Sequence, residues 1–125
     1  MKSRLAILLW ATDPALPDLC ATPFFHAAAA AALDAEVEVH FSACSVLLLV
    51  DGVAAKLFAG AERELSIHDH MQQASRLGAR FLACSDALAA HGIDRKALLP
   101  EVDGIAGAAA FLGRALDPEW ATLVF

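Results

Sequence analysis

The sequence has little positive charge and no long apolar run. Lys and Arg number 9 against 15 Asp and Glu residues, which gives a formal net charge of −6. Because an acidic chain without a basic run repels phosphate backbones, we expect no nucleic-acid partner. Asp51 ends the longest apolar run, residues 43–50, well short of the roughly 18 residues of a membrane-spanning helix. We therefore expect neither nucleic-acid binding nor a membrane span.

We expect neither an export signal nor a disulfide framework. Lys2 and Arg4 precede a short apolar segment, but Asp13 and Pro14 interrupt it before any convincing cleavage site. The chain has 3 cysteines, an odd number that favours free thiols over a set of disulfides. These features predict a cytoplasmic protein.

Glycine is missing from the loop that follows the first predicted strand, residues 12–17. The usual dinucleotide-binding fold needs a Gly-rich turn at that place, where the backbone approaches a pyrophosphate. We therefore expect no nucleotide cofactor, and nothing in the sequence indicates another kind of cofactor.

Apolar residues are present in excess, at 58% of the 125 residues. A chain of this length fits one domain, residues 1–125, and can bury roughly two-thirds of its unfolded surface. The remaining apolar surface predicts contacts between copies of the chain, that is, a homo-oligomer.

Strand-like and helix-like segments alternate along the chain. Apolar segments predict strands at residues 4–11, 37–41, 80–83, 100–102 and 122–125. Caps and glycine stops predict helices at residues 23–35, 45–58, 66–77, 85–91 and 103–116, with Ser85 and Asp103 as caps of the last two. This order predicts an α/β fold: a parallel, doubly wound, flavodoxin-like or Rossmann-like sheet of about five strands with helices on both faces.

Each of the cysteines follows a predicted strand. Cys20 lies in the loop after the first strand, Cys44 comes just after the second, and Cys84 ends the third. Ligands of an open parallel sheet bind beyond the carboxyl ends of its strands. We therefore expect all of these thiols at one functional edge.

Cys84 has the local setting of a reactive thiol. It precedes the helix that Ser85 is predicted to cap, so free backbone N–H groups would point near its sulfur and favour a thiolate. A partly shielded thiolate suits a sulfur carrier or a nucleophile. The alternative is a small buried residue packed at a strand end.

The remaining candidates would support Cys84. Cys44 could resolve an oxidised Cys84, bind a metal or fill space, and Cys20, in a polar loop, is expected to be an exposed thiol that could meet Cys84. His26, near the end of the first strand, could polarise a thiol or lie in an interface. A metal site made of these residues is chemically sensible, but their spacing matches no standard zinc pattern, so we predict no metal.

The other histidines give weaker signals. His68 and His70 are two residues apart in a predicted helix and would lie on nearly opposite faces, so a capping or interface role is favoured over a metal pair. His91 ends a short predicted helix, and His40 falls inside the second predicted strand.

The residues around Cys84 resemble a known family. They form a strand that runs into the pattern Cys-x-x-Ala-Leu-x-x-x-Gly-Ile, residues 84–93, followed by Pro-Glu-Val at residues 100–102. This looks like the signature of the DsrE/DsrF-like family of sulfur-relay and peroxiredoxin-like proteins, and the resemblance covers nearly the whole chain. It implies a persulfide-carrying cysteine at Cys84, flanked by Ser85 and Asp86, and a trimer or hexamer.

Three functions remain open at this point. In the first, which the resemblance favours, Cys84 receives sulfane sulfur from a donor protein and passes it to an acceptor protein, so that any enzymatic activity is that of a sulfurtransferase. In the second, Cys84 is oxidised and Cys44 or Cys20 resolves it as a disulfide. In the third, the chain is a non-enzymatic oligomeric module that binds a small ligand or a metal.

Overall fold

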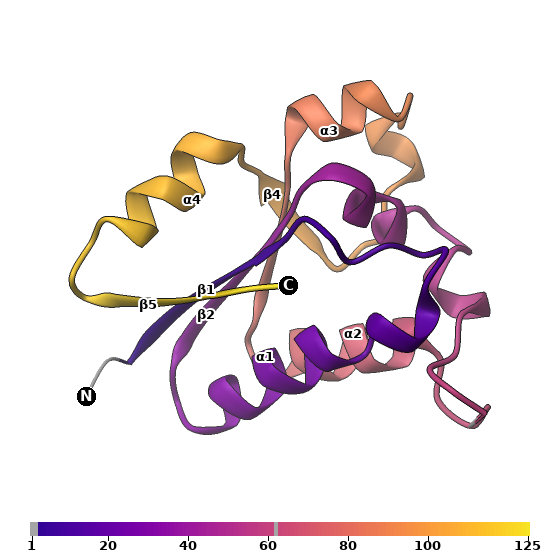
Figure 1. Cartoon of the computed structure of the whole chain (residues 1–125), viewed down its shortest axis with the longest axis horizontal. Coiled ribbons are helices and arrows are strands. Elements are labelled where there is room, and N and C mark those ends of the chain that lie inside the picture. The colour runs from indigo at the N-terminus through magenta and orange to yellow at the C-terminus, as the bar shows by residue number, and fades with distance from the viewer. Residues whose placement is uncertain (1–2, 62) are drawn as a thin grey trace.

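The computed structural model describes residues 3–61 and 63–125. Five parallel strands form one sheet in the order β4-β3-β2-β1-β5 (Figure 1). The strands are β1 Arg4–Leu9, β2 Glu36–Phe41, β3 Arg80–Ala83, β4 Val102–Ile105 and β5 Trp120–Val124. The α/β class and the parallel sheet are therefore confirmed, with strand ends that differ from the predicted ones by a few residues.

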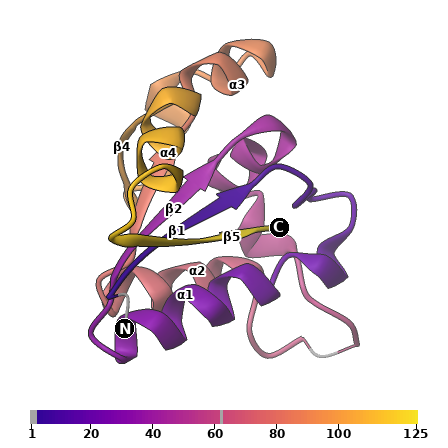
Figure 2. The ribbon, with the colours of Figure 1, turned by 60° about the vertical axis from the view of Figure 1, so that its left-hand side comes forward.

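Helices cover both faces of the sheet. They are α1 Thr22–Ala32, α2 Ile67–Arg76, α3 Ser85–Ala90 and α4 Ala108–Ala115. α1 and α2 lie side by side on one face, and α4 lies on the other (Figures 1 and 2). The reason is the right-handed crossover rule, because the chain moves one way from β1 to β4 and then returns past β1 to reach β5.

Strand β2 shows how the two faces differ. Phe41 points toward α1, where its ring centroid lies 5.9 Å from that of Phe24. Glu38 and His40 have the opposite orientation, as alternation along a strand requires, and Glu38 is hydrogen-bonded to Arg114 of α4. One face of the sheet is therefore an apolar core, whereas the other carries buried polar groups.

One predicted helix is wrong, and another starts later than predicted: the helix expected at residues 103–116 is α4, Ala108–Ala115. Residues 45–58 form two short 3₁₀ helices, Ala43–Leu49 and Ala54–Lys56, because a turn with Gly52 at φ +86° separates them. Asp103 belongs to β4 and caps no helix. The register of β3 and β4 shifts between Phe81 and Leu82, and the Asp103 carboxylate accepts the Phe81 N–H at 2.8 Å.

The predicted start of α2 is confirmed by a capping box. The Asp69 N–H donates to Ser66 Oγ at 3.1 Å, and the Ser66 N–H donates to Asp69 Oδ2 at 2.8 Å.

In the part of the chain that the structure describes, no helix is both long and apolar enough to cross a membrane.

Candidate functional site

Cys84 lies where β3 passes into α3. Its N–H donates to the Phe41 carbonyl oxygen at 2.9 Å, and its own carbonyl oxygen accepts the Leu88 N–H at 3.0 Å. Cys84 is itself the N-cap residue, so the predicted cap Ser85 is instead the first residue of the helix, with exposed Asp86 after it. The backbone thus fixes the position of Cys84, while its side chain is partly exposed.

A cavity of about 390 Å³ opens beside Cys84, between the sheet and α4. Its volume falls in the range of small-molecule sites. Most of the lining is apolar, and the residues are Leu8, His40, Phe41, Ser42, Cys84, Ala106, Gly107, Ala108, Phe111 and Leu112. A reaction at the Cys84 sulfur would therefore take place beside a mostly apolar surface.

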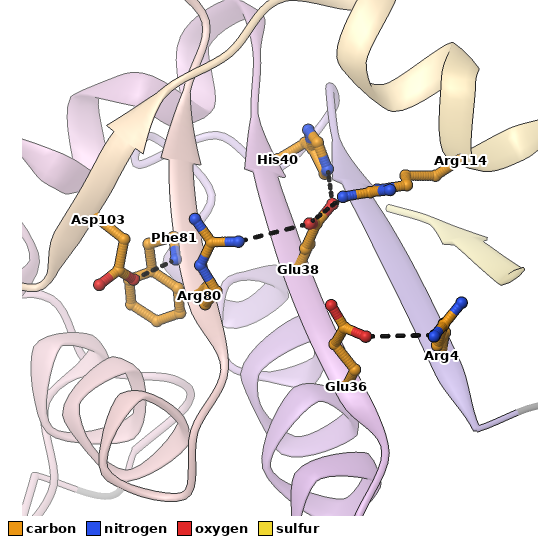
Figure 3. A network of polar contacts seen from close by, with 8 residues as sticks. All are labelled: Arg4, Glu36, Glu38, His40, Arg80, Phe81, Asp103 and Arg114. Atoms are coloured by element: carbon orange, nitrogen blue, oxygen red, sulfur yellow. Dashed lines mark hydrogen bonds and ion pairs between the residues drawn. The ribbon is translucent and has the colours of Figure 1, made fainter.

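An ionic cluster around a buried carboxylate continues from this cavity along the same face of the sheet (Figure 3). Glu38, with a side chain only 2% exposed, lies at its centre. Arg114 binds both of its carboxylate oxygens, at 3.0 Å and 2.9 Å, and Arg80 approaches one of them at 3.7 Å. His40 Nε2 lies 3.1 Å from Glu38 Oε1. The two-pronged Arg114 contact is the geometry that best compensates a buried carboxylate.

The pKa directions define the charges of this cluster. Burial alone would raise the pKa of Glu38, but hydrogen bonds from Arg114 and His40 outweigh burial and lower that pKa below 4.5. Burial lowers the pKa of His40 below 6.5, and the nearby Glu38 only partly opposes this. At neutral pH the pair therefore consists of a carboxylate and a neutral imidazole.

Sequence reasoning missed Glu38 and gave His40 no role. The signal was the alternation at residues 36–41, Glu-Val-Glu-Val-His-Phe, which puts three polar residues on one face of a strand. In a sheet buried on both faces, such a polar row needs partners from the covering helix. Arg114 supplies that partner and also stacks over Trp120, with its guanidinium carbon 4.3 Å from the ring centroid.

The prediction that Cys20 is exposed is wrong. Residues 13–20 fold into a turn and a short 3₁₀ helix, which bring two carbonyl oxygens toward the sulfur. Cys20 is completely buried in the core, and its Sγ lies 3.3 Å from the Asp13 carbonyl oxygen and 3.6 Å from that of Leu16. Burial, with Asp13 and Cys44 adding to it, raises the pKa of Cys20 to about 11.

Cys44 lies near Cys20 and contributes to its raised pKa. Its Sγ is 3.8 Å from the Thr12 carbonyl oxygen, and its pKa is raised by burial and by Asp13. In the described chain, the lining of the Cys84 cavity includes neither Cys20 nor Cys44. Each thiol thus follows a strand of the sheet, as predicted, but among the three only Cys84 lines this cavity.

His26 lies apart from Cys84. Its Nδ1 is 2.9 Å from the Thr22 carbonyl oxygen, and its exposed ring packs against Phe125. Among the described residues, no group of three or more His, Cys, Asp or Glu side chains is arranged to hold a metal ion. The structure therefore does not assemble the metal site considered above.

His68 and His70 contact different neighbours. His68 Nε2 lies 3.1 Å from Glu101 Oε1, and the His70 ring meets the Phe25 ring edge-on, with centroids 4.8 Å apart. They are not brought together as a ligand pair.

Known structures share this fold. The chain is similar to the ychN protein from E. coli, with 12% sequence identity, a TM-score of 0.75 and coverage of 100% of both chains. It is also similar to a protein of unknown function from Methanobacterium thermoautotrophicum, MTH1491, with 22% identity, a TM-score of 0.66 and coverage of 98% of each chain. A comparison with curated proteins gives no match.

The family is shown by a match over almost the entire sequence. The model of the DsrE/DsrF-like family matches residues 7–125. This range contains the second half of β1, all the other strands, and Cys84 with the residues that line its cavity. The chain belongs to the DsrE/DsrF-like family.

Proposed function

We propose that this chain is a sulfur-relay protein that carries sulfane sulfur as a persulfide on Cys84. The observation that carries the proposal is the position of Cys84, a partly exposed thiol that lines an apolar cavity at the carboxyl edge of the sheet. Membership of the DsrE/DsrF-like family supports it. Burial raises the pKa values of Cys20 and Cys44, which makes both thiols poor nucleophiles at neutral pH.

The proposed step conserves atoms and electrons. Cys84 Sγ attacks the outer sulfur of a donor persulfide, R–S–SH, and the S–S bond of the donor breaks. The outer sulfur stays on Cys84 as Cys84–S–SH, while the proton of the original Cys84 thiol passes to the leaving R–S⁻. No oxidant or reductant is consumed, and attack by an acceptor thiol on the outer sulfur returns Cys84 to its starting state.

The partners of this relay are a donor protein, an acceptor protein and further copies of the chain. Leu112 of α4 and Leu116, which directly follows α4, are 54% and 77% exposed, and Leu112 also helps to line the cavity. Exposed apolar residues at this place support a homo-oligomer, which we propose to be a trimer or hexamer. The free thiols suit the reducing cytoplasm.

A thiol redox function receives less support. It would require Cys44 or Cys20 to attack an oxidised Cys84, and the raised pKa of each disfavours the thiolate that such an attack needs. The absence of both residues from the described lining of the Cys84 cavity argues in the same direction.

Intact mass spectrometry tests the proposal. Wild type, Cys84→Ser and Cys44→Ser are incubated with cysteine persulfide, and the mass is recorded before and after reduction. We expect a reducible gain of one sulfur atom in wild type and in Cys44→Ser, and no gain in Cys84→Ser. Equal gain in Cys84→Ser, or no gain in wild type, would contradict the proposal and favour a ligand-binding module.

A further inference from the structure

His40 has one ring nitrogen without a partner. Its Nε2 faces Glu38 Oε1, and because Glu38 is a carboxylate, Nε2 carries the hydrogen and donates it. Nδ1 is then an acceptor, and it is buried with no hydrogen-bond partner among the described residues. Figure 3 shows Nδ1 on the side of the ring that faces away from Glu38. A buried unpaired acceptor is costly, so its position calls for a donor.

The cavity beside Cys84 offers the place for that donor. His40 is only 3% exposed, yet its side chain lines the same cavity as Cys84. Phe111 of α4 packs edge-on against the imidazole, with centroids 5.4 Å apart, and holds the ring at the wall. No hydrogen bond joins Cys84 Sγ to Nδ1 among the described residues, but because both residues line this cavity, an S–H group there, or a water bound to it, can reach the unpaired Nδ1.

The groups around His40 come from each element packed against it. They are Glu38 on the same strand, Arg80 on β3, Cys84 at the end of β3 and Arg114 on α4. A proton on His40 would be stabilised by Glu38 and opposed by Arg114. The contacting carboxylate and neutral imidazole share a cavity with a thiol, and these are the three kinds of group that activate a nucleophile.

We propose that His40 is the catalytic base of the Cys84 cavity and that Glu38 and Arg114 are its positioning residues. His40 Nδ1 takes the proton of the Cys84 thiol as Sγ attacks the outer sulfur of an alkyl persulfide. The imidazolium then gives that proton to the departing alkyl thiolate. Arg114 holds Glu38, and Glu38 holds the imidazole in the tautomer that leaves Nδ1 free. The inference rests on the proposed function, because it names the base for that reaction.

The test is the pH dependence of alkylation at Cys84, which does not require sulfur transfer. Rates with iodoacetamide are measured for the Cys84 peptide by mass spectrometry, from below the pKa of His40 to above neutrality. With a neutral base present, the wild-type rate is expected to reach a plateau once His40 has lost its proton, below pH 6.5. In His40→Gln the plateau should disappear, and the rate should rise with pH throughout, as for attack by the free thiolate.

The same variant is then tested in the sulfur reaction. At neutral pH, His40→Gln should gain sulfur from cysteine persulfide about a hundredfold more slowly than wild type, with the gain still at Cys84. His68→Gln is the matched control, because His68 also pairs with a carboxylate at 3.1 Å. It should keep the plateau and the wild-type rate.

If His40→Gln does not fold, NMR of the wild-type protein replaces it. The ¹⁵N resonances of the His40 ring report which nitrogen carries the hydrogen, and we expect a protonated Nε2 and a bare Nδ1 at neutral pH. A protonated Nδ1, a wild-type profile without a plateau, or a plateau that survives in His40→Gln would overturn the assignment. If the plateau is present but Cys84 takes up no sulfur, His40 stands as the base and the relay function fails.

Discussion

The two faces of the sheet serve different purposes. Toward α1 and α2, the rings of Phe24, Phe41 and Phe81 pack with centroids 5.3–5.9 Å apart, and the thiol on that side, Cys20, is sealed in the core. Toward α4, buried Glu38 and His40 stand beside a cavity. Because both sets of residues alternate along the same strand, one face can be optimised for packing and the other for chemistry.

The comparison also explains why the thiols differ. A cysteine in a close-packed apolar layer loses the stabilisation of its thiolate, as the pKa of about 11 for Cys20 shows. Cys84 instead lies at the wall of a cavity. The face on which a cysteine lies thus decides how deeply it is buried, more than its position along the chain does.

The largest expected effect lies on the packed face. Phe24→Ala removes a fully buried ring that contacts two others, and we expect the free energy of unfolding to fall by about 3–5 kcal/mol. Urea denaturation measures it. Phe25→Ala is the control, since Phe25 is 51% exposed and should cost below about 1 kcal/mol. Similar losses for both variants would contradict the picture of a one-sided core.

On the polar face, Arg114→Met leaves the buried Glu38 carboxylate without its main partner while keeping the length of the side chain. Loss of a buried partner costs about 3–5 kcal/mol, and because Arg114 is 39% exposed we expect roughly 2–3 kcal/mol. Arg4→Met, which breaks a surface pair with Glu36, should cost below about 1 kcal/mol. An unchanged free energy of unfolding in Arg114→Met would show that burial of Glu38 does not depend on this ion pair.

The thiols provide a third comparison between the faces. The pKa of Cys20 is raised from 9.0 to about 11, which lowers its thiolate fraction at neutral pH by about a hundredfold. In the native protein, Cys84 should therefore react with iodoacetamide long before Cys20, and both should react in urea. Peptide mass spectrometry follows each site. Rapid labelling of native Cys20 would contradict its burial.

The smallest expected effect is the pH dependence of stability. Because the folded-state pKa of His40 lies below 6.5, the unfolded chain binds a proton first as the pH falls through 6.5. The free energy of unfolding should therefore decrease below that pH, and Glu38 should add a second decrease below pH 4.5. Urea midpoints at several pH values measure both, and His40→Gln should remove the first. A wild-type midpoint that rises as the pH falls from 6.5 would contradict the signs.

Much of the fold could be predicted because the apolar runs and turn residues are local signals. β3 was placed at its observed bounds, and the capping box of α2 was recognised from Ser66 and Asp69 alone. The errors arose where a tertiary contact decides. Asp103 is of a residue type that caps helices, but its carboxylate instead accepts a hydrogen bond from the N–H of Phe81, 22 residues away.

The site was only half predictable for the same reason. The pattern around Cys84 is contiguous in sequence, so the sequence alone can single out Cys84 as a candidate. The partners of His40 come from β2 and from α4, and Arg114 is 76 residues away from Glu38. A single sequence shows the polar alternation of residues 36–41 but cannot show which helix covers it. The burial of Cys20 likewise depends on how residues 13–20 fold back over the sulfur.

Transfer of isotopically labelled sulfur is the most direct measurement of the relay. The protein is loaded with labelled cysteine persulfide, separated from the donor, mixed with an acceptor thiol, and sampled by peptide mass spectrometry at each cysteine. We predict that the label appears on Cys84 and then declines there as it appears on the acceptor. Label that spreads equally over Cys20, Cys44 and Cys84, or that stays on Cys84 while the acceptor gains none, would contradict the role of Cys84 as the carrier.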